Sequence, residues 1–477
     1  MSSTVQNSAS SRIAALLDEN SFVEIGAKVT ARATDFDMKK NETPADGVVT
    51  GYGVINGNLV YVYSQNASVL GGSIGEMHAK KIVRIYELAM KVGAPVIGLV
   101  DCAGLRLQEA TDALNGFGEI YLKQTLASGV IPQITAIFGN CGGGLAVMPA
   151  ITDFTFMEEK SGKLFVNTPN ALAGNNVSKC DTASAKFQSE TCGNVDFVAG
   201  EEEVLAQIRT LVTMLPANNE DDLSYEECTD DLNRVSADLA NCAGDTSILL
   251  SKIADNESFL ETKAMYAKEM VTGFVKLNGI TVGCVANRSE VYGAEGLETS
   301  MSKVLTPAGC EKAAEFINFC DAFEIPVLSV TNVIGFSAEV EAEKSMAKSV
   351  AKLTYAFANA TVPKVNVITE NAYGSAYVAM NSKSIGADIV YAWEDAKIGM
   401  MDSKLAAKVM YEGEGNDVIN QKAAEYDKLQ NSAESAAGRG YVDTIITAEE
   451  TRKYVIGAFE MLFTKREDRP HKKHGTV

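Results

Sequence analysis

The chain has 477 residues, which exceeds what one hydrophobic core usually supports, so two domains are expected. Its composition, 46% hydrophobic and 22% charged, is that of a globular protein in water. The formal net charge of −20 argues against nucleic acid and anionic membrane surfaces as partners. No apolar run is long enough to span a bilayer, and the first residues do not make a convincing signal peptide.

The nine cysteines are scattered along the chain and none belongs to a CxxC pair. A thiolate zinc site is therefore not expected, and we predict no metal centre. Scattered cysteines in apolar surroundings are typical of a reducing compartment, so we predict a cytoplasmic protein.

The first half begins with a predicted amphipathic helix over 11–24, followed by a polar arm that reaches Asp46. An alternating stretch around Asn56-Gly57 predicts a β-hairpin over 47–65. The remaining elements are predicted as a helix over 76–92, a buried strand over 96–100, a loop over 101–106, a helix over 112–128, a strand over 134–138, a turn over 139–144, and helices over 145–150 and 201–215.

The acidic and polar stretch 218–231 is predicted to be a linker. The second half starts near Asp245, and its core begins near Met270. We therefore divide the chain into domains 1–232 and 233–477. Within the second domain we predict a solvated helical segment over 412–431, a last amphipathic helix over 448–462 and a basic tail that includes His471 and His474.

Two stretches share one layout: IPQITAIFGNCGGGLAVMPA begins at Ile131, and VPKVNVITENAYGSAYVAM begins at Val362. Four anchor residues in the first half have partners 231 positions later (326 − 95, for example), namely Pro95 with Pro326, Gly104 with Gly335, Pro132 with Pro363, and Gly143 with Gly374. The hairpins, with Asn56-Gly57 and Asn278-Gly279, are only 222 positions apart, so the second copy has nine extra residues in the following loop or helix. The chain is a duplicated domain, and each copy is predicted to be an α/β sheet with helices against it.

In each half, two glycine-bearing loops end neighbouring strands. They are Ala103-Gly104-Leu105 with Gly142-Gly143-Gly144, and Ile334-Gly335-Phe336 with Tyr373-Gly374-Ser375. If each pair of loops converges, two backbone N–H groups can bind one carbonyl oxygen as negative charge builds on it, which suits the enolate of a thioester. The alternative is that these glycines only permit close packing of strand and helix, which duplication does not exclude.

The chain also resembles a known family along most of its length. The matching stretches, in order, are RIAALLDENSFVEI, GGSIGEMHAKKIVRIYELA, VIPQITAIFGNCGGGLAVMPAITDFTFM, VDFVAGEEEVLAQIRTLVTMLPANNED, KAAEFINFCDAFEIPVLSVTNVIGF, ATVPKVNVITENAYGSAYVAM and AAGRGYVDTII, then KKHG in the tail. Both halves resemble the crotonase fold, and the whole chain resembles the carboxyltransferase subunits (beta-type) of biotin-dependent acyl-CoA carboxylases and decarboxylases. The resemblance implies two tandem crotonase-like domains.

The resemblance further implies that acyl-CoA binds the first half and that biotin, carried on a separate carrier protein, binds the second. Amides near Gly143 and Gly144, with Gly104 and Leu105, would hold the enolate of the acyl-CoA. Amides near Gly374 and Ser375, with Gly335 and Phe336, would hold the ureido oxygen of biotin, beside which Tyr373 would lie. Biotin itself would be the base at the α-carbon, and propionyl-CoA with methylmalonyl-CoA is the first substrate pair to consider.

The resemblance also implies a homo-oligomer, usually a hexamer, in which a site lies between the first half of one subunit and the second half of another. Further partners would be a biotin carboxylase or a sodium-pumping membrane decarboxylase subunit. Lys80, Lys81 and Arg84 form a candidate cluster for the CoA phosphates, although a solvated helix face explains them as well. His78 is predicted to be a surface residue of the same helix and not a catalytic group.

One biotinylation-like tetrapeptide is rejected. Ala89-Met90-Lys91-Val92 resembles AMKM, but Lys91 ends an amphipathic helix, where a lysine is favoured by the helix dipole. We expect no biotin on this chain.

The sequence departs from the family near the second half's loops. Asn332-Val333-Ile334 replaces an acidic-proline sequence, Ser375 replaces a second glycine, and Glu394 follows Ala392-Trp393 where the family has proline. The segment 160–192 also matches poorly. These changes bear on the substrate and on activity, although Ser375 can still offer its N–H if its position does not need positive φ.

Two other interpretations stay open. A tandem crotonase-type hydratase or isomerase would need a carboxylate near the enolate site; Glu109, Glu119 and Glu158 are available but are expected on helix surfaces. A non-catalytic scaffold with a degenerate biotin half is the other.

Overall fold

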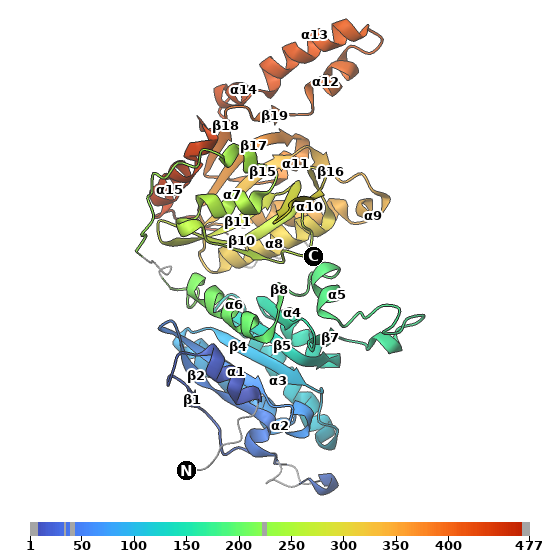
Figure 1. The fold of residues 1–477 in the computed structure, drawn as a ribbon, viewed down its shortest axis with the longest axis vertical. Helices are drawn as coiled ribbons and strands as arrows, with labels where there is room; N and C mark the ends of the chain where they lie inside the picture. The colour runs from blue at the N-terminus through green and yellow to red at the C-terminus, as the bar shows by residue number, and fades with distance from the viewer. Residues whose placement is uncertain (1–7, 33–34, 39–42, 222–226, 470–477) are drawn as a thin grey trace. The chain divides into compact units, whose positions relative to one another are not determined.

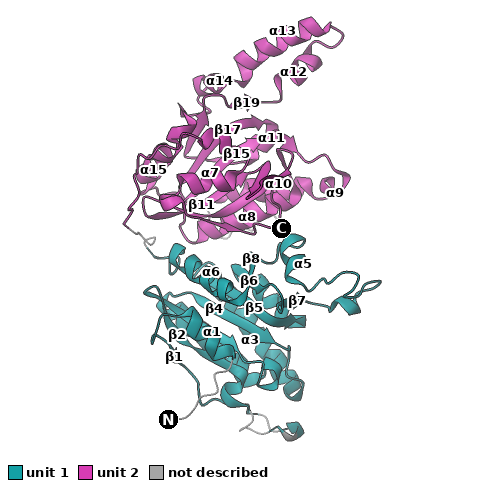
Figure 2. Cartoon of the chain, viewed as in Figure 1, with its two compact units in different colours: residues 1–224 teal, residues 225–477 magenta. Residues whose placement is uncertain are grey.

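The computed structural model describes residues 8–32, 35–38, 43–221 and 227–469. The chain forms two compact units, Met1–Ser224 and Tyr225–Val477 (Figure 2). The proposed domain boundary after residue 232 lies close to this division. His471 and His474, in the predicted basic tail, lie outside the described residues. Within the described ranges, no helix combines the length and the apolar character needed to cross a membrane.

Unit 1 is built on one eight-stranded sheet in the order β1-β2-β3-β4-β5-β6-β8, with β7 paired to β5 (Figure 1). Its strands are β1 (Val23–Glu24), β2 (Val48–Ile55), β3 (Asn58–Gln65), β4 (Val96–Cys102), β5 (Gln133–Gly142), β6 (Phe154–Glu158), β7 (Lys163–Phe165) and β8 (Phe197–Ala199). Its helices are α1 (Ser8–Leu16), α2 (Glu76–Val92), α3 (Ala110–Ala127), α4 (Val147–Ile151), α5 (Ala185–Glu190) and α6 (Glu201–Met214).

Unit 2 repeats this order in a second eight-stranded sheet, β9-β10-β11-β15-β17-β18-β20, with β19 paired to β17. Its strands are β9 (Phe259–Thr262), β10 (Met270–Leu277), β11 (Ile280–Asn287), β12 (Glu290–Gly293), β13 (Gly296–Ser300), β14 (Val304–Leu305), β15 (Val327–Val333), β16 (Gly335–Phe336), β17 (Lys364–Tyr373), β18 (Ile389–Trp393), β19 (Lys397–Gly399) and β20 (Thr444–Ile446). Its helices are α7 (Thr246–Ile253), α8 (Pro307–Ala322), α9 (Val340–Glu343), α10 (Met346–Asn359), α11 (Gly374–Ala379), α12 (Ser403–Met410), α13 (Asn416–Tyr426), α14 (Ala433–Gly438) and α15 (Thr451–Leu462).

The two predicted hairpins are present and turn at the same dipeptide. Asn56 and Gly57 both have positive φ (48° and 85°), as do Asn278 and Gly279 (51° and 75°). Two consecutive positive φ angles match the right-handed twist of the flanking strands, which is why Asn-Gly is favoured there. The extra residues of the second copy lie in the loop before α8, where the exposed hairpin β12–β13 is inserted.

Two element predictions were wrong, and long-range pairing explains both. The first helix ends at Leu16, and Val23–Glu24 instead pairs with β2. The turn predicted over 139–144 is extended as far as Gly142, because Asn140–Gly142 pairs with β7, more than twenty residues further along the chain. The turn itself is confined to a 3₁₀ segment at Gly143–Ala146. By contrast, α2 spans the predicted residues 76–92.

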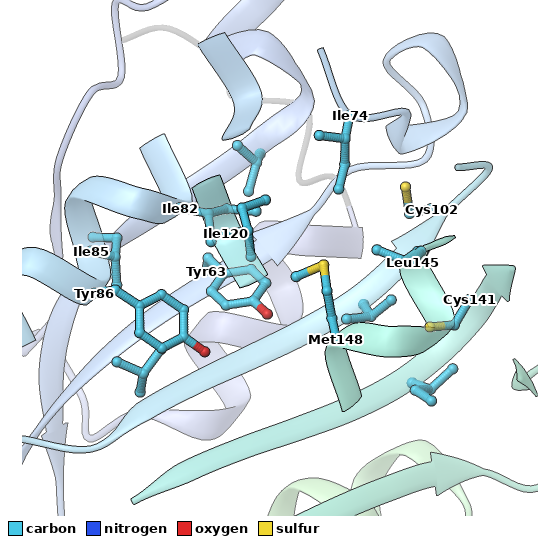
Figure 3. Close-up of a cluster of buried hydrophobic side chains, with 14 of the residues drawn as sticks. Tyr63, Ile74, Ile82, Ile85, Tyr86, Cys102, Ile120, Cys141, Leu145 and Met148 are labelled. Carbon is cyan, nitrogen blue, oxygen red and sulfur yellow. The ribbon is translucent and has the colours of Figure 1, made fainter. Parts of the chain in front are cut away.

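The core of unit 1 lies between its sheet and helices α2 and α3. Figure 3 shows Ile82, Ile85 and Tyr86 together with Tyr63 of β3, all of them buried. Leu145 and Met148, from the segment that follows the turn, are fully buried in the same cluster. These buried side chains therefore fix the turn to the core, while its main chain lies at the edge of the sheet.

A second feature is duplicated: in each unit an arginine of a late helix binds an aspartate that accepts a main-chain amide of the hairpin turn. We call this contact the arginine–aspartate closure. In unit 1, Arg209 of α6 donates to the Leu16 carbonyl (2.6 Å) and to Asp18 (2.7 Å), which in turn accepts the amide of Gly57. In unit 2, Arg452 of α15 donates to the Ile253 carbonyl (2.6 Å) and to Asp255 (2.7 Å), which accepts the amides of Asn278 and Gly279. The repeat therefore extends upstream to α1 and α7.

Candidate functional site

The predicted loops of each unit follow two adjacent parallel strands. In unit 1, Cys102 of β4 and Cys141 of β5 are register partners, so Gly104 and Gly143, two residues beyond each, end the same edge of the sheet. In unit 2, Val333 of β15 and Ala372 of β17 are partners in the same way, ahead of Gly335 and Gly374. An irregularity interrupts both ladders one residue earlier, between Val100 and Cys102 and between Thr331 and Val333. We call the two regions, residues 103–105 with 142–144 and residues 334–336 with 373–375, the first bend and the second bend.

The central glycines of the two bends share one backbone conformation. Gly143 has φ of 64° and Gly374 has φ of 62°, a region that side-chain-bearing residues rarely adopt. Each glycine opens a helical turn whose first amides lack intrahelical acceptors and lie at the positive end of the helix dipole. At Gly143 an added Cβ would meet no atom within 4 Å. The geometry can present main-chain N–H groups to a negatively charged oxygen.

The loop after β4 contributes a second amide to the first bend. The Gly104 N–H is directed at Cys102 Sγ, 3.3 Å away, which is a weak acceptor that an anionic oxygen can replace. Gly104 has φ of 105°, and the loop is tied back by the Ile74 amide, which donates to the Gly104 carbonyl at 2.9 Å. The second bend is tied in the same way, because β16 (Gly335–Phe336) pairs with β14 (Val304–Leu305).

Two aromatic residues that sequence reasoning missed line the first bend. Phe117 and Tyr121 of α3 stack with ring centroids 6.0 Å apart, and the Tyr121 hydroxyl donates to the Gly144 carbonyl. An added Cβ at Gly144 would stand 3.2 Å from both side chains. The spacing of Phe117 and Tyr121 on one helix face was visible in the sequence, but nothing there indicated what that face covers.

At the second bend, Ser375 is exposed and lies within α11, where its φ is not positive. A serine can therefore offer the same amide as a glycine. Tyr373 precedes Gly374 and is 7% exposed, and burial raises its pKa to about 12. Its phenol is thus neutral over the physiological range. Trp393 is buried as well, and its indole N–H donates to Thr451 at 3.0 Å.

The family departure at Asn332 belongs to a polar cluster beside the second bend. Asn332 donates to Glu370 at 2.8 Å, and Glu370 also pairs with Lys303, whose carbonyl accepts the Ile334 amide. Sequence reasoning missed Lys303 and Glu370, since neither stands in a motif. At the positions of unit 1 that match Lys303 and Glu370, 231 residues earlier, the chain has glycines, Gly72 and Gly139.

The predicted cluster of Lys80, Lys81 and Arg84 is not one surface patch. Lys80 and Arg84 are exposed and pair with Glu76 and Glu87. Lys81 is 6% exposed, and its Nζ donates to the carbonyls of Ala45 and Val48. Neither phosphate binding nor a solvated face describes Lys81. Burial, against the opposing charges of Glu24 and Asp46, lowers its pKa to about 8.

Unit 2 contains the counterpart of Lys81 on its matching helix. Lys312 of α8 is 2% exposed, and its Nζ donates to the carbonyls of Lys263 and Tyr266, both at 2.8 Å. Burial lowers its pKa to about 7. Both lysines tie a helix to the segment that enters the hairpin.

The prediction that His78 lies on the surface was wrong. Its side chain is fully buried, with Nδ1 2.9 Å from the Asp46 carbonyl and Nε2 3.2 Å from Gln65 Nε2. The carbonyl requires the proton on Nδ1, so Nε2 accepts from the glutamine amide. Burial, reinforced by the charges of Arg106 and Lys81, holds the His78 pKa well below its usual value.

Two of the three carboxylates predicted on helix surfaces are also buried. Glu109 is 5% exposed and accepts the Glu76 amide at the start of α2 (2.6 Å). Glu158 ends β6 and accepts the Lys160 and Ser161 amides. Only Glu119 is exposed. Since each buried carboxylate is committed to main-chain amides, neither is a free base beside the first bend. Within the described ranges, no group of three His, Cys, Asp or Glu side chains could hold a metal ion.

Comparison with known proteins agrees with this geometry. Residues 5–477 match the family described as the carboxyl transferase domain. The alpha subunit of methylmalonyl-CoA decarboxylase from Propionigenium modestum is 40% identical over 98% of this chain and 92% of that protein. The propionyl-CoA carboxylase beta chain of Roseobacter denitrificans is 41% identical with the same coverage.

A solved structure extends the comparison to three dimensions. A transcarboxylase 12S crystal structure, described as a hexamer assembly with hydrolysed methylmalonyl-coenzyme A bound, superposes with a TM-score of 0.91 at 37% identity, over 98% of this chain and 92% of that one. A single-chain, multi-domain long-chain acyl-CoA carboxylase shares the fold at 22% identity, with a TM-score of 0.78 over 94% of this chain and 45% of that one. The chain therefore belongs to the carboxyl transferase domain family and is a carboxyltransferase of the propionyl-CoA carboxylase and methylmalonyl-CoA decarboxylase type.

Proposed function

We propose that this chain moves a carboxyl group between carboxybiotin, borne on a separate carrier protein, and the α-carbon of a short acyl-CoA. Propionyl-CoA and methylmalonyl-CoA are the first pair to test, because relatives named for them align over nearly the whole chain. The single observation that carries the proposal is the pair of matched bends, each with a left-handed glycine at the end of a parallel strand.

At the first bend, the amides of Gly143 and Gly144, with those of Gly104 and Leu105, hold the thioester oxygen as it becomes an enolate oxygen. The open space at Gly143 supports this assignment, because a side chain there would occupy the approach of the ligand. Donors already fixed by the main chain stabilise charge that appears only in the transition state, which is what accelerates a reaction.

At the second bend, the amides of Gly374 and Ser375, with those of Gly335 and Phe336, hold the ureido oxygen of biotin, next to Tyr373. Ser375 is an exposed residue, which fits a ligand delivered from outside on a carrier. When bound, biotin supplies the carboxyl group and the basic nitrogen that exchanges a proton with the α-carbon. Accordingly, His78, Glu109 and Glu158 are buried and engaged with the protein itself.

We further propose a homo-oligomer, with the first unit of one subunit facing the second unit of another, up to the hexamer that the transcarboxylase 12S structure is described as forming. Its partners are the biotin carrier and either a biotin carboxylase or a membrane decarboxylase subunit. Lys80 and Arg84 remain candidates for the CoA phosphates, since both are exposed. We place the protein in the cytoplasm, where its nine free cysteines stay reduced.

A carboxyl-transfer assay tests the proposal. The purified chain is given biotin or a biotinylated carrier and, separately, malonyl-, methylmalonyl- and glutaconyl-CoA. We expect biotin-dependent transfer, fastest with methylmalonyl-CoA. Failure to transfer or bind any acyl-CoA would favour a scaffold, and exchange of the α-proton without biotin would favour a hydratase or isomerase.

A further inference from the structure

Arg106, which directly follows the Gly104-Leu105 loop, is among the most deeply buried charged residues of unit 1. Its side chain is 1% exposed. The guanidinium donates to Asp46 Oδ1 at 2.6 Å, to Glu109 Oε1 at 2.7 Å and to the Ser73 carbonyl at 2.9 Å. Burying a charge is costly unless it is fully paired, and here the contacts with Asp46 and Ser73 tie the loop to two other segments.

The two carboxylates carry the connection further. Glu109 uses its other oxygen to accept the Glu76 amide at the start of α2, and Asp46 uses its other oxygen to accept the His78 amide at 2.7 Å. Arg106 thus links the loop to the first turn of α2 and to the segment before β2. Desolvation raises the pKa of Asp46, while Arg106 opposes that shift by favouring the carboxylate.

An uncharged arm holds the other end of the same loop. Gln65 Oε1 accepts the Asp101 amide at 3.3 Å, while its amide nitrogen contacts His78 Nε2. His78 in turn donates from Nδ1 to the Asp46 carbonyl. The main chain on both sides of Gly104, at Asp101 and at Arg106, is therefore fixed to one buried network.

The second bend lacks this buried network around Arg106, which we call the charged clamp. Its counterpart of Gln65, Asn287, still accepts the Asn332 amide at 3.1 Å. The positions that match Arg106 and His78, 231 residues later, are Ser337 and Gly309. Main-chain pairing holds the loop at both bends, since the Ser337 amide donates to the Leu305 carbonyl at 2.8 Å just as the Arg106 amide donates to the Ile74 carbonyl at 2.9 Å. The charged clamp is thus a property of the first bend and not of the fold.

We infer that Arg106 is a positioning residue that fixes the Gly104-Leu105 amides for the acyl-CoA oxygen, an inference that rests on the proposed function. It touches no reacting atom and acts through the loop. Donors held in place before reaction need no reorganisation as charge develops, and a displacement of about 1 Å can cost roughly 100-fold in rate. Among the described residues, no buried cation fixes the matched loop of the second bend.

The test compares two buried, fully engaged arginines that lie in different units. Arg452 is also 1% exposed and binds one buried aspartate, Asp255, and the main-chain carbonyls of Asp231 and Ile253, but it belongs to neither bend. In the full-length protein, Arg106→Lys is expected to lower the single-turnover rate of carboxyl transfer at least tenfold, with KM for acyl-CoA changed less than twofold. Arg452→Lys is expected to lower the melting temperature similarly while its transfer rate stays within twofold of wild type.

Amide hydrogen exchange gives a readout that does not depend on activity. Peptides that cover 101–106 are expected to exchange faster in Arg106→Lys, and those that cover 332–337 are not. A rate within twofold of wild type for Arg106→Lys, or an equal loss of rate in Arg452→Lys, would overturn the inference. If Arg106→Lys does not fold, Gln65→Met perturbs the uncharged arm and is expected to lower the rate threefold to tenfold; no loss there would likewise overturn it.

The two proposals fail separately. An inactive wild type refutes the proposed function alone. In that case, unchanged exchange at 101–106 in Arg106→Lys would still overturn the clamp, and faster exchange there would support it.

Discussion

The two bends of this chain have the same backbone and different supports. Gly143 and Gly374 share their φ, their register and their place before a helical turn. Main-chain pairing ties the loop at both bends, but the supporting side chains differ: a buried charged network and an aromatic pair at the first bend, and the cluster of Lys303, Asn332 and Glu370 at the second. Duplication preserved the arrangement of donors, and each copy acquired its own way of holding them. The main chain is thus what the two bends share, and the surrounding side chains are where they differ.

The largest effect is expected from proline at the central glycines. Proline lacks an N–H and cannot adopt the positive φ of 64° at Gly143 or 62° at Gly374. Loss of one preorganised donor typically costs about 100- to 1,000-fold in rate, so Gly143→Pro and Gly374→Pro should each abolish measurable transfer. Transfer rates with methylmalonyl-CoA measure this.

Gly413→Pro is the matched control, because Gly413 is also left-handed (φ 93°) with open space around it, but it belongs to neither bend and lies in the loop between α12 and α13. It should transfer at close to the wild-type rate. Full activity in Gly143→Pro would rule out the first bend as the enolate site, and full activity in Gly374→Pro would break the equivalence of the two bends.

The next largest effect is expected on stability, from the difference between the two arginine–aspartate closures. Arg452 and Asp255 have side chains only 1% and 7% exposed, against 26% and 30% for Arg209 and Asp18. Asp255→Ala leaves a buried guanidinium short of its partner, which should cost roughly 3 kcal/mol of unfolding free energy. Fluorescence of the single tryptophan, Trp393, reports the unfolding of unit 2 in urea.

Asp18→Ala, followed by hydrogen exchange of unit 1 peptides, should show a smaller loss, since water screens that pair. Equal losses in the two variants would mean that burial does not distinguish the closures.

A pH-dependent contrast is expected at Asp153. It accepts the Gln133 amide at 2.7 Å, and burial raises its pKa to about 7. Between pH 4 and 7 the folded state keeps a proton that the unfolded chain has released, so this group's contribution to stability falls as pH rises through that window and is constant above it. Asp153→Asn keeps the acceptor and removes the titration.

The variant's unfolding free energy relative to wild type should therefore improve by on the order of 2 kcal/mol from pH 4 to pH 8. Urea unfolding at several pH values, followed by the exchange of unit 1 peptides, measures the trend. At the matching position Asp388 is paired with Lys465 at 2.8 Å, so the same substitution there breaks an ion pair instead. A constant difference at Asp153 across pH would contradict the prediction.

The smallest effect is expected for Ser375→Gly. Because Ser375 does not require positive φ and the residue is exposed, removing its side chain should change the bend's backbone little. Transfer should stay within about twofold, corresponding to less than 0.5 kcal/mol. A tenfold gain would instead show that the serine impairs the second bend.

The sequence predicted the repeated strands, the hairpins and the bends because those features depend on local rules. Asn-Gly turns, alternating strands and the spacing of α2 can be read without knowing what lies opposite. It did not predict where β5 ends, since that depends on pairing with β7, or the burial of His78, since that depends on Asp46 and Gln65 across the unit. Charge on a helix is a poor guide to exposure when a long side chain can reach main-chain carbonyls, as Lys81 does.

The candidate site divides in the same way. The glycines were predictable because the two copies could be compared with each other. The supporting residues Arg106, Tyr121 and Lys303 were not, since each matters through contacts that only the fold creates. Of the three, Arg106 gave the best signal, because an arginine with Glu109 three residues later follows directly on the Gly104-Leu105 loop.

The paired lysines, Lys81 and Lys312, bear on the history of the chain. Each lysine lies at the matching position of its helix and donates to carbonyls just before the matching hairpin of its own unit. A feature that both copies share is expected to predate the duplication, so this lysine is older than the differences between the two units. The single-copy ancestor is thus expected to have had this contact between helix and hairpin. A reconstructed single module is expected to fold around that lysine.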